Sequence, residues 1–411
     1  MKNITKLILL LFAIFILGTG CRSQAQTGAR DIFAGVADVF ILREDNTLWG
    51  AGYNRSDQFG LGSASGDPRI TRINDEKGSP FGGIKSVAAG ENHTVILKDD
   101  GTLWGAGDSS YGELGLEGGR LSAFTQLKAD GAPISGVKAV AAGNNSTFFI
   151  DSEGSLWATG YNYYGELGLG TRVQQSSFKK AESAGKDIKA IAAGIRHTVL
   201  LKEDGTLWAA GYNYNGQLGL GADAQGDTAD KDSFTEVKDA GSGITGVAAG
   251  NYHTVILKKD GSVWTAGSNY WGQLGFSDRS DHLSFTRVSD EKGNPLTGVK
   301  DIAARGNITV LLKADGSLLL AGNYTDSEGM VEPASNAGVG EDSTQTDGSS
   351  FIPLVPEQGA KFPGVKKIVL GYNSIYVIAT DGCLWAAGSN RYGQLSLDSD
   401  TETSSVLKLI E

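Results

Sequence analysis

The chain repeats one short pattern seven times, and this repetition limits the possible folds more than any other feature. The copies are DNTLWGAG at 45–52, DGTLWGAG at 100–107, EGSLWATG at 153–160, DGTLWAAG at 204–211, DGSVWTAG at 260–267, DGSLLLAG at 315–322 and DGCLWAAG at 381–388. Successive copies begin 51 to 66 residues apart. A period of this size is typical of chains built from similar units that stack on their neighbours.

Two further patterns accompany the copies. Upstream lies an apolar segment such as VAAGENHTVILK at 87–98, and downstream lies a turn such as YGELGL at 111–116. The run TVILK predicts a strand buried on both faces. Asp-Gly suits a two-residue hairpin, and LWGAG is the return strand. A fourth segment, FTQLKAD at 124–130, completes a unit of about four strands, the size of a propeller blade.

The combined pattern AAGxxHT, DGxLWAxG and YGQLG resembles the repeat of the regulator of chromosome condensation family, over about residues 31–410. The resemblance implies an all-β fold, a closed seven-bladed β-propeller. The first copy lacks an FTxV segment, whereas the chain ends with SSVLKLIE at 404–411. We therefore expect Val406–Leu409 to pair into the first blade, so that the C-terminal strand closes the ring.

The sixth copy departs from the pattern. Leu319 replaces the Trp, Arg305 replaces the Gly of AAG, and the YGQLG turn is missing. An insertion near 323–360 is rich in Ser, Gly, Asp and Glu. This composition predicts a long surface loop inserted in a propeller domain that spans 31–411, with a binding loop as the alternative.

Residues 1–20 predict a signal peptide. Lys2 and Lys6 precede an apolar run, LILLLFAIFIL at 7–17. A helix of this length reaches about 17 Å, too short for a hydrocarbon core of about 30 Å. The segment therefore has the pattern of a cleaved export signal.

The segment LGTGC at 17–21 resembles a bacterial lipobox, with cleavage before Cys21 and acylation of its thiol. Residues 21–30 would then form an acylated tether. This predicts an exported lipoprotein of the bacterial cell envelope that contacts the membrane through its lipid anchor alone. An ordinary secretory signal, cleaved nearby at a site such as Ala25, is the alternative.

The charge and the polar residues argue against several functions. The formal net charge is −11, and nucleic-acid binding normally depends on a basic stripe, so no nucleic-acid partner is expected. His93, His197 and His253 occupy one repeat position and would be spread around a ring, which predicts structural hydrogen bonds and no metal site. The sequence contains no catalytic triad order, CxxC or phosphate loop. We therefore expect neither an enzyme nor a cofactor.

Aromatic residues gather in two loop positions of the repeat. The candidate binding residues are Tyr161, Tyr163, Tyr164, Tyr212, Tyr214, Tyr252, Tyr270 and Trp271. Tyr and Trp are common in binding hot spots. Packing between blades is the alternative interpretation of these rings. Asn162, Asn213 and Asn269 would either contact a partner or satisfy their own turns.

These observations predict an envelope-anchored binding or scaffold protein that uses an aromatic-rich propeller face to bind a protein partner. A glycan- or cell-wall-binding module is the alternative, because aromatic rings also stack on sugars. A propeller hydrolase would need an acid/base pair, which the sequence does not provide.

Overall fold

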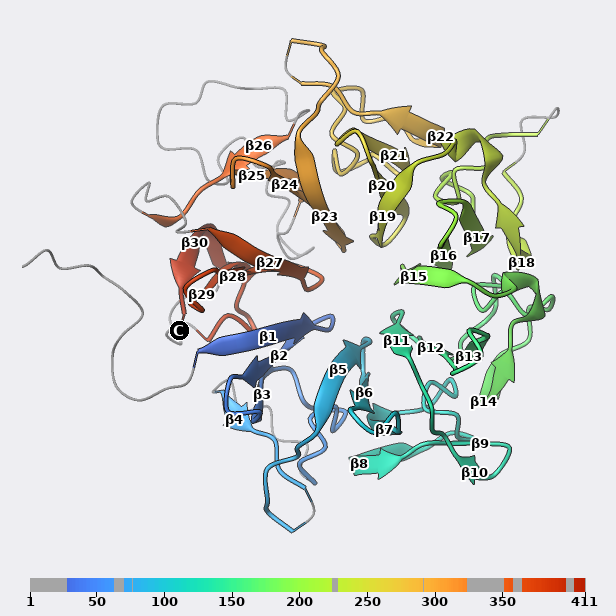
Figure 1. Ribbon diagram of the computed structural model, residues 1–411, viewed down its shortest axis with the longest axis vertical. Coiled ribbons are helices and arrows are strands. Elements are labelled where there is room, and N and C mark those ends of the chain that lie inside the picture. The colour runs from blue at the N-terminus through green and yellow to red at the C-terminus, as the bar shows by residue number, and fades with distance from the viewer. Residues whose placement is uncertain are drawn as a thin grey trace, which may run out of the picture.

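The computed structural model describes residues 28–62, 70–75, 77–223, 228–290, 292–323, 351–357, 364–396 and 403–410. Seven four-stranded sheets surround a central axis, and the strands of every sheet follow the chain order (Figure 1). The predicted all-β, seven-bladed propeller with four strands per blade is confirmed. Cys21 and the predicted signal peptide lie outside the described residues.

Blades one to four contain the following strands, each given from the axis outward. They are β1 (Ala29–Ala34), β2 (Asp38–Arg43), β3 (Leu48–Gly52) and β4 (Thr71–Arg72); β5 (Ile84–Ala89), β6 (His93–Lys98), β7 (Leu103–Asp108) and β8 (Arg120–Gln126); β11 (Ala139–Ala142), β12 (Ser146–Ile150), β13 (Leu156–Gly160) and β14 (Gln175–Lys180); β15 (Ile188–Ala193), β16 (His197–Lys202), β17 (Leu207–Gly211) and β18 (Lys231–Glu236).

Blades five to seven continue in the same order. Their strands are β19 (Ile244–Ala249), β20 (His253–Lys258), β21 (Val263–Gly267) and β22 (His282–Arg287); β23 (Val299–Arg305), β24 (Asn307–Lys313), β25 (Leu318–Asn323) and β26 (Ile352–Leu354); β27 (Val365–Leu370), β28 (Ser374–Ala379), β29 (Leu384–Ser389) and β30 (Thr403–Leu409). Between blades lie β9 (Lys128–Ala129), β10 (Ala132–Pro133) and the 3-10 turns η1 (Glu182–Ala184) and η2 (Lys238–Ala240).

The residues of the DGTLW pattern build one hairpin. Asp100 Oδ1 accepts hydrogen bonds from the backbone N of Thr102 at 2.9 Å and from its hydroxyl at 2.6 Å. The Thr102 hydroxyl accepts one from Trp104 Nε1 at 3.0 Å, and Lys98 Nζ lies 5.2 Å from the Trp104 ring centroid. These local contacts explain why Asp, Thr or Ser, Trp and a preceding Lys recur together.

The core lies between blades. One cluster joins Phe148 and Leu156 of blade three to Leu200 and Phe234 of blade four. Gly168 sits against this Phe234 with φ at +66°, and a Cβ at Gly168 would lie 2.2 Å from the Phe234 ring. The Gly of one blade and the Phe of the next therefore form a matched pair, and burying such a ring contributes about 2 kcal/mol.

The three repeat-equivalent histidines link neighbouring blades. Nε2 of His93, His197 and His253 each lies 3.0 to 3.1 Å from a Thr hydroxyl of the following blade. Thr254 Oγ1 donates its own hydrogen to Gln217 O at 2.7 Å, so it accepts from Nε2–H of His197. Burial lowers the pKa of His197 to about 4, which keeps the ring neutral. The predicted structural role is confirmed, with the difference that the bond crosses from one blade to the next.

The expected pairing of the C-terminal strand was wrong. Val406–Leu409 belong to β30, which pairs with β29 in blade seven, where Trp385 lies opposite Leu409. Blade one has its own outer strand, β4, with Arg72 opposite Trp49. The chain after β3 is long enough to return and complete its own blade, so no strand is exchanged between the ends.

The ring closes by side-chain packing between the first and last blades. Ile32 of β1 packs in one cluster with Tyr376 and Ile378 of β28. Lys366 Nζ also donates to Arg30 O across this junction at 3.0 Å. Figure 1 shows β1 and β27 side by side.

Blade six keeps four strands despite its divergent sequence. Within the predicted insertion, Ile352–Leu354 form its outer strand, with Leu354 opposite Leu318 and Ile352 opposite Leu320. Residues 324–350 and 358–360 of the predicted loop lie outside the described residues. In the part of the chain that the structure describes, no helix is long and apolar enough to cross a membrane.

Candidate binding face

Two sets of loops emerge on the same face of the propeller. One set follows the innermost strand of each blade and the other follows the third strand, which runs in the same direction because all pairings are antiparallel. The candidate residues Tyr161, Tyr163, Tyr164, Tyr212, Tyr214, Tyr252, Tyr270 and Trp271 lie in these loops of blades three, four and five. We call this surface the tyrosine face.

Each tyrosine loop is held from below by two buried side chains. In blade three, Asn162 Oδ1 accepts the backbone N of Leu167 at 3.0 Å, and Glu166 Oε2 accepts that of Tyr164 at 2.9 Å. Asn213 and Asn269 accept the equivalent bonds in blades four and five. The three Asn side chains therefore satisfy their own turns and are buried, in agreement with the second of their two predicted roles.

Three tyrosines at one repeat position project into solvent. Tyr163 is 65% exposed, Tyr214 is 72% exposed and Tyr270 is 70% exposed. Blades three, four and five are neighbours in the ring (Figure 1). Burial between blades, the alternative interpretation of these rings, therefore does not apply to these three side chains.

A second group of rings, Tyr164, Tyr212 and Tyr252, is half-buried and connected by ring contacts. The Tyr164 and Tyr212 ring centroids are 4.9 Å apart, and Tyr212 lies 6.0 Å from Tyr252 and 6.4 Å from Tyr214. The Arg196 guanidinium lies 4.9 Å from the Tyr164 ring centroid. The contacts of Tyr212 with Tyr164 and Tyr252 are edge-to-face and its contact with Tyr214 is stacked, and such contacts hold the rings in fixed orientations.

Two aromatic pairs flank this group. Tyr161 contacts Tyr111 of blade two at 5.3 Å between centroids, and Tyr270 contacts Trp271 at 4.9 Å. Among the described residues, no ring contact connects the Tyr270 and Trp271 pair to the central group. Five of the eight candidate residues thus form one connected group, Tyr163, Tyr164, Tyr212, Tyr214 and Tyr252. Of the other three, Tyr161 pairs with Tyr111, and Tyr270 pairs with Trp271.

The tyrosine face is hollowed at its centre. A cavity of about 370 Å³ is lined by Val36, Glu91, Tyr111, Asn144, Asn145, Tyr161, Ile195, Arg196, Tyr252 and Tyr372. Glu91, Asn145 and Arg196 were not among the residues predicted from the sequence. Their signal was present, since all three lie in the loop that follows the innermost strand: Asn145 and Arg196 stand at the repeat position of Tyr252, and Glu91 stands one residue before it.

Burial perturbs two carboxyl groups beneath the loops. It raises the pKa of Glu113 to about 7 and that of Glu166 to about 7, although hydrogen bonds from the loop backbone oppose the rise. The equivalent position in other blades is occupied by Gln58, Gln217, Gln273 and Gln394. A neutral amide can therefore fill the same place.

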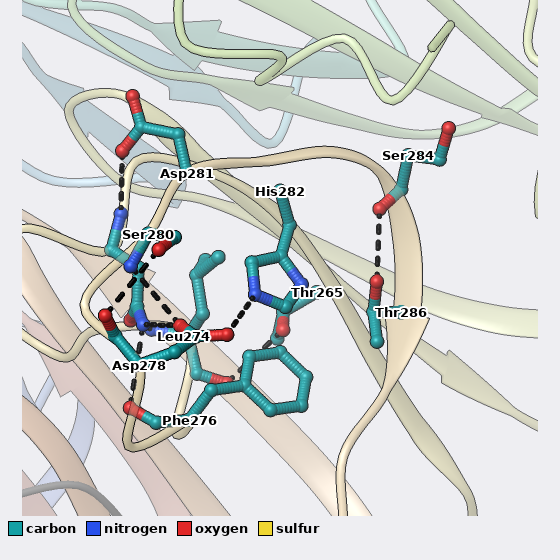
Figure 2. Close-up of polar contacts among 10 residues, drawn as sticks. Thr265, Leu274, Phe276, Asp278, Ser280, Asp281, His282, Ser284 and Thr286 are labelled. Carbon is teal, nitrogen blue, oxygen red and sulfur yellow. Dashed lines mark hydrogen bonds and ion pairs between the residues drawn. The ribbon is translucent and has the colours of Figure 1, made fainter.

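The loop of blade five is fixed by a polar cluster (Figure 2). Asp278 Oδ2 lies 3.3 Å from His282 Nε2, and the His282 ring stacks on Phe276 with centroids 4.4 Å apart. Asp281 accepts the backbone N of Asn269 at 3.1 Å and also the Asn215 side chain of blade four at 2.7 Å. These contacts position the loop that carries Tyr270. Among the described residues, no group of three His, Cys, Asp or Glu side chains could hold a metal ion.

The repeats match two family models, each described as the regulator of chromosome condensation (RCC1) repeat. One matches residues 84–113, 137–166, 188–217, 244–273 and 365–394, and the other matches 153–201 and 204–257.

The chain is similar to the ultraviolet-B receptor UVR8 of Arabidopsis thaliana, with 30% identity over 70% of this chain and 63% of the relative. It is also 30% identical to the regulator of chromosome condensation of Drosophila melanogaster, over 61% of this chain and 47% of the relative. The chain therefore spans less than two thirds of these curated relatives.

Solved structures share the architecture. Human WBSCR16 superposes with a TM-score of 0.69 at 16% identity, over 89% of this chain and 93% of that chain. The structure of Kap60 bound to yeast RCC1 (Prp20) gives 0.68 at 19% identity, over 95% of this chain and 90% of that chain. At this identity the likeness concerns the fold.

Proposed function

Because this chain carries regulator of chromosome condensation repeats folded as a seven-bladed propeller, we propose that it is a binding protein whose tyrosine face takes up a protein partner. The observation that carries the proposal is the exposure of Tyr163, Tyr214 and Tyr270 on three neighbouring blades. Large exposed rings that are firmly held supply contact area at a low entropy cost.

The loops beneath these rings support a preorganised surface. Buried Asn and Glu or Gln side chains hold the loop backbone in every blade from three to five. Little conformational freedom remains to be lost on binding, which favours affinity. The central cavity offers room for a protruding segment of the partner, with Arg196 and Glu91 as charged groups in its wall.

The relatives are consistent with such a role. Prp20p of Saccharomyces cerevisiae, whose structure shares the fold at 20% identity, binds Gsp1p and histones. We propose only the general role for this chain, which is to bind a protein through the tyrosine face. The net charge of −11 disfavours contact with the phosphate backbone of DNA, so a nucleic-acid partner is not proposed.

A glycan is the second candidate. The central cavity is lined by Tyr hydroxyls, the amides of Asn144 and Asn145, Glu91 and Arg196, and such groups also bind sugars. The ring contacts of Tyr161 and Tyr164 are mostly edge-to-face, whereas a sugar ring stacks on an open aromatic face. This geometry favours the protein partner.

We further propose that the chain is exported and acylated at Cys21. The strand β1 begins at Ala29, on the face opposite the tyrosines, and runs toward the tyrosine face. Cys21 precedes Ala29 by eight positions, and an extended chain of this length reaches at most about 30 Å. A lipid at Cys21 would therefore keep the opposite face near the membrane and leave the tyrosine face accessible.

The test is affinity capture from the native envelope, with the mature chain as bait. Tyr163→Ala/Tyr214→Ala/Tyr270→Ala should lose the captured protein, because hot-spot rings contribute about 2 kcal/mol or more each. Leu409→Ala, an exposed apolar residue of the outer strand, is the matched control and should retain it. Capture of polysaccharide or peptidoglycan in place of a protein would favour the glycan candidate. Equal capture by the wild type and the triple variant would exclude the tyrosine face.

A further inference from the structure

A ring of basic residues surrounds the axis on the face opposite the tyrosines. A basic residue stands at the start of the innermost strand in six of the seven blades: Arg30, Lys85, Lys138, Lys189, Lys300 and Lys366, with Thr245 in blade five. The five Lys side chains are exposed. This concentration of positive charge contrasts with the net charge of −11.

Hydrogen bonds show that ring members lie next to one another. Lys85 Nζ donates to the backbone O of Lys138 in the next blade at 3.2 Å. Lys366 Nζ donates to the backbone O of Arg30 at 3.0 Å across the junction of the last and first blades. The ammonium groups therefore lie along the rim and together form one region of positive charge.

A cavity lies on the propeller axis, farther along the innermost strands than the ring residues, none of which lines it. This cavity of about 330 Å³ is lined by the innermost strands of all seven blades, chiefly by small and aliphatic residues such as Ala88, Ala141 and Ala192. Lys367 lies in its wall. We call the ring and this cavity the basic funnel.

Arg305 lies in the basic funnel at the end of β23 nearest the tyrosine face. It stands where the other six blades have Gly, at the end of the AAG pattern. Its Nη2 donates across the channel to Ala89 O at 3.1 Å, and its Nε is buried without a partner. A second cationic group therefore lies inside the cavity, close to the buried carboxyl group of Asp38.

Carboxyl groups also lie in and around the funnel. Asp31 is paired with Lys367. Asp38 is buried, and burial raises its pKa to about 7 against the opposing effect of Arg305. The hairpin aspartates of this face, such as Asp100 and Asp204, accept hydrogen bonds from their own turns, which lower their pKa and keep them ionised. These turns join the second and third strands, so the aspartates lie farther from the axis than the innermost strands that carry the rim lysines.

We propose that the basic funnel binds a small, multiply charged anion of the phosphate class. A cavity of this size is within the range for small-molecule sites, and a ring of like charges around a low-dielectric cavity concentrates counter-ions. The anion is drawn in by the rim lysines and meets the Arg305 guanidinium inside. Charge-assisted hydrogen bonds of guanidinium to phosphate are among the strong ones.

The test is calorimetric titration of the mature chain, carrying Cys21→Ser, with inorganic tripolyphosphate at low and high salt. We expect saturable one-to-one binding that weakens by about tenfold or more between roughly 50 and 300 mM NaCl, because contacts between basic side chains and phosphates are strongly salt-dependent. Arg305→Gly restores the residue of the other six blades, so it should fold, and it should weaken binding about tenfold or more.

Charge reversal provides the matched control. Lys85→Glu/Lys138→Glu should abolish measurable binding, whereas Arg55→Glu/Arg391→Glu makes the same change of charge on the tyrosine face and should leave it intact. Equal weakening by both pairs would mean a non-specific response to net charge and would overturn the proposal. Absence of saturable binding, or binding only to phosphatidylglycerol vesicles, would overturn it as well.

Discussion

Replacing Glu166 by Gln should stabilise this protein above neutral pH. The carboxyl group lies beneath the Tyr164 loop, where Oε2 accepts a backbone hydrogen bond and Oε1 is buried without a partner. Burial raises the pKa of Glu166 from 4.5 to about 7. An amide at this position carries no charge, and Gln217 makes the equivalent bond to Asn215 in blade four.

The sign follows from proton linkage. Between pH 4.5 and about 7 the folded protein binds a proton at Glu166 that the unfolded chain has lost, so stability falls as pH rises through this window. Above pH 7 the full penalty of a buried carboxylate remains. One pKa unit corresponds to about 1.36 kcal/mol, so the rise in the pKa of Glu166 corresponds to roughly 3 kcal/mol. We expect a gain of about 2 kcal/mol at pH 8.5, because the new amide leaves one buried donor unpaired.

The assay is urea unfolding followed by Trp fluorescence at several pH values from 5 to 8.5. The advantage of Glu166→Gln should shrink below about 1 kcal/mol at pH 5, where the wild-type carboxyl group is protonated in the folded state. The reverse change, Gln217→Glu, should make stability fall more steeply with pH. Superimposable pH profiles for the wild type and Glu166→Gln would refute the reasoning.

Three further experiments address separate features of the molecule. His197→Ala should cost about 1–3 kcal/mol in denaturant unfolding, because it leaves the buried hydroxyl of Thr254 without its donor, and Thr254→Val alone should cost a similar amount. Gly168→Ala should lower the melting temperature by several degrees or more, because its Cβ would meet Phe234 at 2.2 Å and its φ is +66°; unchanged melting would contradict the close packing of neighbouring blades. Intact mass of the mature protein should show acylated Cys21 at the N-terminus, and an unmodified N-terminus beyond that residue would disprove the anchor.

Much of the fold was predictable because each blade is built from local signals. Asp100, Thr102 and Trp104 contact one another within five residues, so the hairpin can be recognised in any copy of the pattern. Gly168 and Phe234 belong to neighbouring repeats, and their contact recurs because each blade meets the next in the same way. Number, order and type of strands therefore follow from the repeat alone.

The outer strand of blade one shows where local signals failed. Residues 70–75, ITRIND, match FTRVSD at 285–290 except for conservative changes. They were not recognised as a strand of this type because Ile replaces both the Phe and the Val of the expected FTxV pattern. The C-terminal segment, which has the same character, was therefore assigned to the wrong blade. An outer strand pairs with the blade whose third strand still has an open edge when the chain returns to it. In blade one, the connection after Gly52 brings β4 to that edge. The packing of Ile32 against Tyr376 then joins blade one to blade seven.

The repeat placed the tyrosines in loops, but the tertiary structure decided what each side chain does. Tyr163 and Tyr164 are adjacent in sequence, yet the first projects into solvent and the second packs against Tyr212 of the next blade. The period of the basic residues is likewise visible in the sequence. The direction of the innermost strand places Lys85 on the face opposite Tyr214, because that strand runs from one face of the propeller to the other. A periodic pattern determines which residues are equivalent, whereas the closure of the ring determines which of them meet.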